Sequence, residues 1–567
     1  MRTATWAAKG LMGVAVCILA FGCPSGASGA TYVVDQANPA ADDKNPGTEE
    51  KPFGTIQRAA DAAKAGDTVC VMEGNYPERV KLPASGTGEK WITFTAFPTR
   101  RVLMNGFDTN GASYIRIQGF DISNPDRFYG KSEGLYEGGI QITSQHLEAT
   151  DNFIHDLGCA VHGDKGGDIR LAYNRFYKCQ QQLLILGENW TVENNEISRV
   201  IQYTKSDGDY CRGWGKGHVL RYNRFHGTHK FVKPGEENEV PTAHLDCFQT
   251  WALKPYHLLQ DFTFEDNMCE VFSQGAMIER ATEMDPNALA RLTFRRNIYW
   301  HGGAYGLCLG HITGVTVENN TFAQIKLFGV GMKTCTGQRV NNLYVDVRPE
   351  QWKPWWDDGN KETHLDDPGV VDRKNGNFRL KKGSPLIGAG AGGGTPGALE
   401  YPNVYYVDPR HPGADDEGFG YPGWPYKTAA KALATAESGE TVILRGGVYR
   451  ETLKPAKDGV TIRAMKGETV VVSGADLVEG WKRQAAGWSA PLAARPTRLL
   501  RDGKPWSEFT YDEAAKALSV KTGGDPRLHV WETVVRKQAV DLSGRTGVKV
   551  EGVEVRDTLE GPAAPGR

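Results

Sequence analysis

The sequence lacks a marked charge of either sign. Its 567 residues include 66 lysines and arginines and 68 aspartates and glutamates, which gives a net charge of −2. No basic stripe indicates a nucleic-acid partner, and no acidic tail is present. Balanced charge, 68 glycines and a mean hydropathy of −0.46 are typical of a soluble, turn-rich protein with many short strands.

Cysteine pairs at metal-ligand spacing are also missing. None of the ten cysteines lies in a C-x-x-C motif, which argues against a zinc cluster. Apart from two near the N-terminus, all lie between Cys70 and Cys335. Cys159 and Cys179 are about one repeat apart, so that a disulfide and two stacked buried thiols both fit their spacing.

Long apolar runs are absent after the N-terminus. The run Leu11–Phe21 follows two basic residues and precedes small residues up to Ala30, which predicts a signal peptide over residues 1–30. The run is too short to span a bilayer. We therefore expect a secreted or periplasmic protein with no membrane span, and the alternative is a lipoprotein anchored at Cys23.

A short repeat is the clearest positive signal. It consists of an apolar residue, two residues, an asparagine, one residue and a second apolar residue, as in LAYNRF at 171–176 and VENNTF at 317–322. Most of the spacings between these asparagines are 21 to 30 residues. The asparagines are Asn152, Asn174, Asn195, Asn223, Asn267, Asn297 and Asn320, with a looser copy around Asn342. A β-propeller has longer periods and a leucine-rich repeat has helical segments, so the pattern favours an all-β, right-handed parallel β-helix.

The asparagine has a physical role in such a coil. A strand that winds into a stacked rung must turn sharply, and asparagine tolerates the left-handed backbone better than most residues. Its side-chain amide can also bind the equivalent amide one rung away. We therefore expect the repeat asparagines to form a ladder at one corner, while the flanking apolar residues fill the interior.

The ends of this coil can also be placed. Phe53–Ala65 carries apolar residues at helical spacing, which predicts a helix that closes the N-terminal mouth of the coil. We assign residues 31–390 to the β-helix and the glycine-rich residues 391–403 to a linker.

A second copy of the opening follows the linker. Tyr32–Val80 and Tyr405–Leu453 align without a gap at an offset of 373 residues, which grows to 433 further on. Residues 404–567 therefore form a second, partial β-helix unit with about 60 extra residues, roughly 476–540, which we interpret as an inserted small β-domain. This second coil is short, so either the chain is a fragment or the unit leans on the first.

Both units resemble known families. PFGTIQRAADAAKAGDTV and GNYPERV in the first unit resemble the start of secreted β-helix proteins of the pectate-lyase-like superfamily. SGADLVEGW at 473–481 and LLRDGKPW at 499–506 resemble β-helix glycoside hydrolases with an inserted β-domain, such as certain β-xylosidases. The resemblance implies a fold rather than a reaction, and the first unit lacks the paired-aspartate signature of polygalacturonases.

Candidate site residues lie on strands of the first unit. In HLDCFQTW (244–251), His244 and Asp246 have the same strand parity, and an aspartate beside a histidine should be exposed, paired or functional. Counting back from the repeat asparagines places Asp209 and Glu279 on the flanking rungs. The predicted catalytic residues are His244, Asp246, Glu279, Asp209 and Arg212. The predicted substrate-binding residues are Gln249, Lys165, His162 and Arg280.

Two chemistries fit such a cluster. A pair of carboxylates can act as acid and base, or as nucleophile and acid, in glycoside hydrolysis. Three carboxylates on one face can instead hold Ca²⁺, which would favour a lyase with Lys165, Arg212 or Arg280 as the base. In structural alternatives, His162 is a surface histidine and Glu279 pairs with Arg280.

These observations give three functional hypotheses. The first is a secreted enzyme, a lyase or a hydrolase, that cleaves glycosidic bonds in a polysaccharide on an outer face of the coil. The others are a non-catalytic carbohydrate-binding protein and a structural solenoid of the cell surface. In each case we expect a monomer whose partner is a polysaccharide or oligosaccharide and not a nucleic acid.

Overall fold

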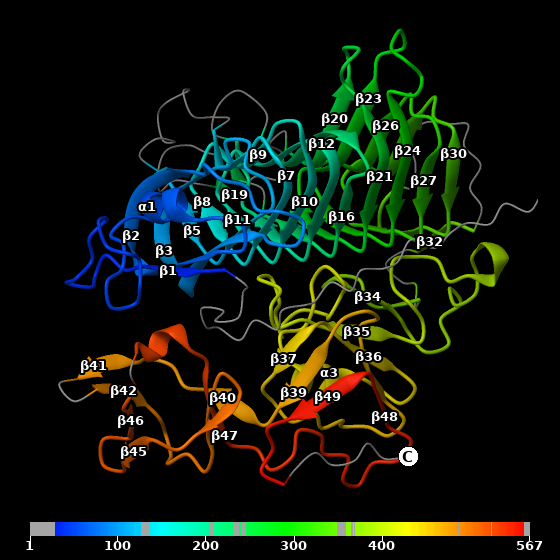
Figure 1. Cartoon of the computed structure of the whole chain (residues 1–567). Helices are drawn as coiled ribbons and strands as arrows, with labels where there is room; N and C mark the ends of the chain where they lie inside the picture. Colours follow the sequence, from blue (N-terminus) through cyan, green and yellow to red (C-terminus); the bar gives the residue numbers. More distant parts are fainter. Residues whose placement is uncertain are drawn as a thin grey trace, which may run out of the picture.

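The first unit is a long solenoid in the computed structural model of the chain (Figure 1). The structure describes residues 29–125, 137–202, 208–227, 229–230, 238–239, 245–348, 359–363, 367, 369–484, 487–522 and 524–560. The predicted signal peptide and His244 lie outside the described residues.

The solenoid is a right-handed parallel β-helix with three columns of stacked strands, as the sequence predicts. The first column contains β6 (Gly138–Ile142), β9 (Cys159–Gly163), the start of β12 (Gln181–Glu193), β15 (Asp209–Lys216), β20 (Asp246–Ala252), β23 (Gln274–Arg280), β26 (Tyr305–Gly310) and β29 (Phe328–Lys333). The second contains β1 (Thr31–Val34), the starts of β2 (Thr68–Lys81) and β3 (Ile92–Asp108), which continue through the third column into the first, β4 (Ile115–Gln118), β7 (Gln145–Thr150), β10 (Gly166–Ala172), the end of β12, β16 (Val219–Arg221), β21 (Leu259–Glu265), β24 (Leu289–Arg295), β27 (Val315–Glu318) and β30 (Gly337–Val340). The third contains β5 (Asp121–Ser123), β8 (Phe153–His155), β11 (Arg175–Tyr177), β13 (Glu196–Ser198), β17 (Arg224–His226), β22 (Met268–Phe272), β25 (Ile298–Gly302), β28 (Thr321–Ala323), β31 (Leu343–Val345) and β32 (Lys361–Thr363).

Apolar side chains stack inside this coil from rung to rung. In the first column, the register brings Leu183, Cys211, Phe248, Ala276 and Leu307 to one position, and all five are buried in a single core. Because each rung buries the apolar surface of the next, the rungs stabilise one another along the whole solenoid.

The predicted asparagine ladder is confirmed. The side-chain amide of each asparagine from Asn152 to Asn342 donates to the Oδ1 of the next one, ending on Asn360, at 2.9 to 3.1 Å. The backbone conformation differs from the prediction, because the left-handed residue is the one before each asparagine, such as Asp151 (φ 59°) or Tyr173 (φ 59°). The preceding residue makes the turn, and the asparagine satisfies buried backbone groups inside the corner.

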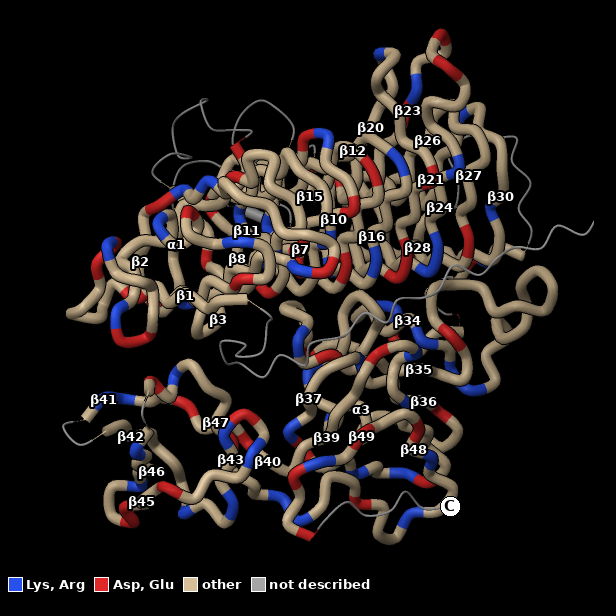
Figure 2. Tube along the Cα trace, viewed as in Figure 1, with Lys and Arg blue, Asp and Glu red and all other residues tan. Residues whose placement is uncertain are grey.

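Charged residues on the outer face of the second column alternate in sign from rung to rung. Arg170 and Arg221 both pair with Glu193, each at 2.8 Å, and two rungs further on Arg295 pairs with Glu265 at 2.6 Å. Figure 2 shows acidic and basic residues interspersed along this side of the coil. On this side of the coil, charges of opposite sign on neighbouring rungs thus form ion pairs.

Each unit begins with a short capping helix. The predicted first helix is confirmed over the shorter range Ile56–Ala62 (α1), and α3 (Ala429–Thr435) occupies the equivalent place in the second unit. Thr55 and Thr428 are the N-caps of the two helices. In the described part of the chain, no helix has the length and apolar character that a membrane crossing would need.

The second unit forms two short parallel sheets. One contains β35 (Val404–Val407), β36 (Thr441–Leu444), β38 (Thr461–Ala464) and β48 (Lys549–Glu551), and the other contains β37 (Gly447–Tyr449), β39 (Val470–Ser473) and β49 (Val553–Arg556). The chain between β39 and β48 forms two antiparallel sheets that project to one side (Figure 1). Their strands are β40 (Ala475–Leu477), β47 (Trp531–Val534), β43 (Leu499–Arg501) and β44 (Lys504–Trp506) in one sheet, and β41 (Lys482–Gln484), β42 (Gly487–Pro491), β46 (Ala517–Val520) and β45 (Phe509–Asp512) in the other.

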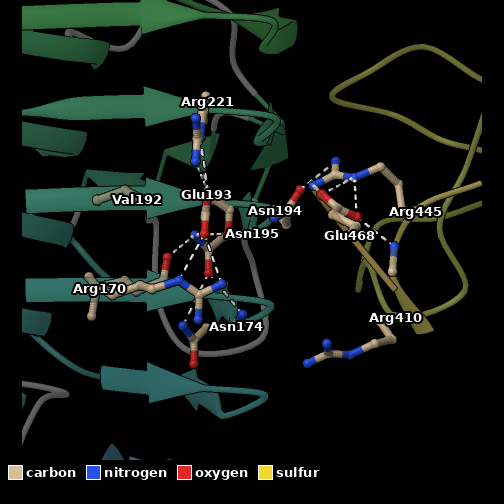
Figure 3. A network of polar contacts seen from close by, with 12 residues as sticks. Arg170, Asn174, Val192, Glu193, Asn194, Asn195, Arg221, Arg410, Arg445 and Glu468 are labelled. Carbon is tan, nitrogen blue, oxygen red and sulfur yellow. Dashed lines mark hydrogen bonds and ion pairs between the residues drawn. The ribbon is translucent and has the colours of Figure 1, made fainter. Parts of the chain in front are cut away.

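The second unit packs against the corner and third column of the first. Arg445 donates to the Oδ1 of Asn194 at 2.9 Å and pairs with Glu468 at 2.9 Å (Figure 3). Arg410 pairs with Asp151 at 3.2 Å. Beside these polar contacts, aromatic residues of the second unit join an apolar cluster with outer residues of β22, β25 and β31. The second unit therefore covers much of the third column and lies on the side of the solenoid away from β20 and β23 (Figure 1).

All eight cysteines in the described residues are free thiols. Cys159 and Cys179 are both buried free thiols, so no disulfide joins them, and the residue in register with Cys159 on the next rung is Gln181. Burial raises the pKa of both thiols, which keeps them protonated and unreactive.

Candidate functional site

Two aspartates occupy equivalent positions on neighbouring rungs of the first column. Asp209 begins β15 and Asp246 begins β20, and the pairing of Arg212 with Gln249 sets their common register. The backbone N–H of Asp246 donates to the Oδ1 of Asp209 at 3.1 Å. Both residues are fully buried. The structure thus brings these two predicted residues together, although they are 37 positions apart in the sequence.

Two outward side chains reach back to this pair. The guanidinium of Arg212 forms an ion pair with the Oδ2 of Asp209, and the Nε2 of Gln249 donates to the Oδ2 of Asp246 at 3.2 Å. Each contact joins residues three apart on one strand. Buried charge must be compensated, and the ion pair supplies that compensation for Asp209.

Polar side chains extend the aspartate column in both directions. Gln181 precedes Asp209 in the register, and Gln274 follows Asp246 and accepts a hydrogen bond from the Tyr305 hydroxyl. Burial, with a smaller contribution from Asp246, raises the pKa of Tyr305, so the phenol remains a proton donor. The sequence analysis missed these three residues. Counting two positions back from the core residue of each rung would have found them.

Glu279 does not join the two aspartates as predicted. It pairs in register with Trp251, whereas the partner of Asp246 on that rung is Gln274. Five residues of strand span roughly 16 Å, so the expected convergence of three carboxylates is wrong. Counting back from the asparagines assumed a constant rung length, but the connections at 253–258 and 281–288 differ in length. Glu279 lies instead on the exposed outer face.

The convergence of three carboxylates was also the basis for a calcium site. Among the described residues, no group of three or more histidine, cysteine, aspartate or glutamate side chains is arranged to hold a metal ion. In the first column, the two aspartates are joined by the hydrogen bond from the Asp246 backbone N–H to the Asp209 carboxylate.

The remaining predicted residues are spread over the first unit. The guanidinium of Arg280 donates to the carbonyls of His311 at 3.0 Å and Met284 at 2.7 Å, so it holds the loop after β23 and does not pair with Glu279. His162 lies in the same outward column as Arg212, two rungs or about 10 Å away. Lys165 occupies a left-handed turn position (φ 57°) and is exposed.

Two tryptophans that the sequence analysis missed flank the site. Trp214 and Trp251 lie two residues beyond Arg212 and Gln249, and they share one register position. Their rings meet edge to face at 4.6 Å, and the Nε1 of Trp214 donates to the Trp251 carbonyl at 2.8 Å. The Arg212 guanidinium lies 5.0 Å from the centre of the Trp251 ring. Strand parity, which places each tryptophan beside an outward polar residue, was the available signal.

Comparisons of sequence match limited parts of the chain. Residues 40–83 match a family model described as a protein of unknown function (DUF1565). A stretch of 146 residues is 30% identical to the uncharacterized protein YwoF of Bacillus subtilis (strain 168), and it covers 23% of this chain. The match spans 30% of that relative's length.

Three solved structures with similarity to this chain carry names of carbohydrate-active enzymes. Pectate lyase Pel9A is 15% identical with a TM-score of 0.40, over 68% of this chain and 99% of the other. The GH136 lacto-N-biosidase from Eubacterium ramulus is 11% identical with a TM-score of 0.39, over 59% and 68%. The PL6 family alginate lyase AlyGC is 13% identical with a TM-score of 0.37, over 74% and 67%. The predicted β-helix fold itself is confirmed by the parallel strand pairing of the first unit.

Proposed function

We propose that this protein is a carbohydrate-active enzyme that cleaves glycosidic bonds of a polysaccharide at the outer face of the first column. The observation that carries the proposal is the Asp209–Asp246 pair, held by Arg212 and Gln249 on adjacent rungs. The pectate lyase, lacto-N-biosidase and alginate lyase named above agree with a carbohydrate substrate. The signal-peptide pattern of residues 1–30 supports export of the enzyme.

The different partners of the two aspartates suggest a division of roles. Asp209 accepts from the Asp246 N–H and from the Arg212 guanidinium, and both donors stabilise its ionised form. Asp246 lies beside the Asp209 carboxylate and accepts from the neutral amide of Gln249. Because both aspartates are fully buried, the sugar must displace the Arg212 and Gln249 side chains that contact them. In the proposed reaction, Asp246 then protonates the leaving oxygen while Asp209 acts as the carboxylate.

The spacing of the rungs favours one form of hydrolysis. Side chains that run parallel from neighbouring rungs remain about 4.8 Å apart, close to the roughly 5 to 5.5 Å between the carboxyl groups of retaining glycosidases. Asp209 would then attack the anomeric carbon as Asp246 transfers its proton to the departing oxygen. Water would hydrolyse the glycosyl ester, returning its proton to Asp246.

A second candidate function, carbohydrate binding without catalysis, also has specific support. Asp209 and Asp246 are both fully buried, whereas Arg212 and Trp251 are partly exposed. In this alternative the aspartates are positioning residues that fix Arg212 and Gln249, and the outer side chains contact the sugar. The two functions differ in the effect of neutralising Asp246.

The test is a screen of diverse polysaccharides with and without Ca²⁺, in which both reducing ends and the absorbance of unsaturated products are followed. Unsaturated products would identify a lyase and contradict the hydrolytic roles given above. Asp246→Asn is expected to lower turnover at least 100-fold with little change in melting temperature, because the amide keeps the shape but cannot transfer the proton. The matched control is Asp261→Asn, at an exposed carboxylate that pairs with Arg291, and it should keep full activity. Undiminished cleavage by Asp246→Asn would exclude the proposed acid, and binding without cleavage by the unaltered protein would favour the second candidate.

A further inference from the structure

A row of ring contacts leads from Arg212 into solvent. Arg212 lies over Trp251, whose ring meets that of Trp214 at 4.6 Å. The ring of His257 lies 5.3 Å from Trp214, inclined by 32°, and Tyr256 meets His257 edge to face at 4.7 Å. These contacts connect the aspartate pair to the surface through side chains of two adjacent rungs and one loop.

The loop Leu253–Leu258 is absent from the preceding rung. On the preceding rung, Trp214 is followed directly by Gly215, whereas the equivalent Trp251 and Leu259 are separated by this loop and one further residue. The loop has two solvent-exposed large side chains, Leu253 with 58% of its surface exposed and Tyr256 with 69%. An exposed aromatic beside partly buried rings is a common feature of a binding surface.

Polar atoms without partners lie beside these rings. Within the described part of the chain, the buried Nδ1 of His257, the Oε1 of Gln249 and the Nε of Arg212 form no hydrogen bond. Burial, with a smaller contribution from Lys254, lowers the pKa of His257, so its ring is uncharged at neutral pH. Unsatisfied buried polar atoms are costly, and a ligand hydroxyl could satisfy them.

We propose that the loop Leu253–Leu258 forms a pyranose-binding subsite in which Tyr256 stacks on the apolar face of a sugar ring. A pyranose combines an apolar face with hydroxyl groups around its rim, which matches the exposed ring of Tyr256 beside the imidazole of His257, whose Nδ1 forms no hydrogen bond within the described residues. The subsite receives the sugar next to the one at the Asp209–Asp246 pair. The inference thus rests on the proposed function, and it identifies the ligand as a chain of at least two pyranose residues.

The experiment measures binding separately from cleavage. Full-length protein carrying Asp246→Asn is run through native gels that contain each polysaccharide of the screen, and its retardation gives a dissociation constant. Adding Tyr256→Ala is expected to weaken binding about fivefold to tenfold, because a stacked ring contact is lost. Adding Tyr256→Phe should leave binding within about twofold, since the ring remains. Leu327→Ala is the control, because Leu327 is an apolar residue with 49% exposure outside this loop.

Each outcome bears on the subsite. Retardation unchanged by Tyr256→Ala, or weakened equally by Tyr256→Ala and Tyr256→Phe, would overturn it, and so would the absence of retardation by every polysaccharide. Tyr256-dependent retardation by a polymer that the unaltered protein does not cleave would support the subsite while contradicting the proposed enzyme. Cleavage of a polymer whose binding does not depend on Tyr256 would support the proposed enzyme and contradict the subsite.

Discussion

The two units of the chain open with the same cap, and the copies agree closely in their contacts. Asp43 accepts from the backbone N–H of Thr55 at 3.0 Å, and Asp416 accepts from that of Thr428 at 3.0 Å. Glu78 accepts from the first two N–H groups of α1 at 3.0 and 2.9 Å, and Glu451 does the same for α3 at 2.9 and 2.8 Å. An offset of 373 residues in the sequence thus corresponds to a repeated network of hydrogen bonds.

The outer surfaces of the two caps differ. Met72 of the first unit packs in a small apolar cluster with Val33, Cys70 and Leu528. The second unit has Arg445 at the equivalent position, where it pairs with Glu468 and reaches Asn194 of the solenoid (Figure 3). The two units therefore share the hydrogen-bond network of the cap, and the outer residues of each cap determine which part of the molecule it contacts. In the second unit, those residues bind the first solenoid.

Among the changes that test this comparison, we expect the largest effect on stability from replacing Arg445 by methionine, the residue at the equivalent position of the first unit. Arg445→Met leaves the Glu468 carboxylate without its charged partner and removes the contact with Asn194. Loss of one member of a buried ion pair costs about 3 to 5 kcal/mol. We expect the free energy of unfolding of the second unit to fall by that amount, measured by urea denaturation, and the linker to become sensitive to proteases.

Arg463→Met is the control, because it makes the same substitution at an exposed position of the second unit. The double change Arg445→Met with Glu468→Gln should recover part of the stability, since no charge is then stranded. An unchanged unfolding curve for Arg445→Met would show that the ion pair does not hold the units together.

The two caps should also differ in their response to pH. Burial raises the pKa of Asp408 to about 6, and burial also raises the pKa of its first-unit equivalent, Asp35. A carboxyl whose pKa is higher in the folded state binds protons more tightly when folded. Asp408 therefore lowers stability as the pH rises from about 4 to about 6, by up to about 3 kcal/mol.

Asp408→Asn should remove this loss, since the Asn oxygen can still accept from the Arg410 N–H at 3.1 Å. Measured by urea denaturation between pH 4 and 7, the variant should show a flatter profile than the unaltered protein. Asp35→Asn should flatten the dependence of stability on pH less, because 6% of the Asp35 surface is exposed whereas Asp408 is fully buried. If stability depends on pH in the same way in Asp408→Asn and in the unaltered protein, Asp408 does not cause the loss of stability.

The fold could be predicted from the sequence because its signals are local and repeated. The motif around Asn174 or Asn320 contains both the corner residue and the apolar residues that fill the coil, so one repeat predicts a rung. The position of the turn was missed because the left-handed residue before each asparagine varies, from Asp151 to Tyr173 to Asn194. With so varied a residue type, composition gives no signal for that conformation.

The candidate site could be predicted only in part, because it depends on register between rungs. Asp209 and Asp246 precede consecutive ladder asparagines and do lie together. Glu279 was misplaced because connections of unequal length shift the count along the strand. Side-chain direction also determines the outcome, as with Arg280, which binds backbone carbonyls of the following loop. Neither loop length nor such contacts follow from strand parity.

The smallest expected difference concerns the helix N-caps, where the two units should respond alike. Thr55 and Thr428 each accept from the third residue of the following helix, at 3.3 and 3.2 Å, and each donates to an aspartate, at 2.9 and 2.8 Å. Removing an N-cap hydroxyl typically costs about 1 kcal/mol. Thr55→Ala and Thr428→Ala should each lower the free energy of unfolding by about that amount, measured by urea denaturation.

Thr55→Ser and Thr428→Ser are the matched controls, because serine keeps the hydroxyl and should retain most of the stability. Each helix closes one end of a coil core, with Ile56 and Ala59 buried in the first unit and Ala429 and Ala432 in the second, so fraying of either helix exposes similar apolar surface. Equal losses would show that the caps remain energetically equivalent although Met72 and Arg445 bind different partners. A loss in one unit that exceeds the other by more than about 1 kcal/mol would show that docking has changed the cap itself.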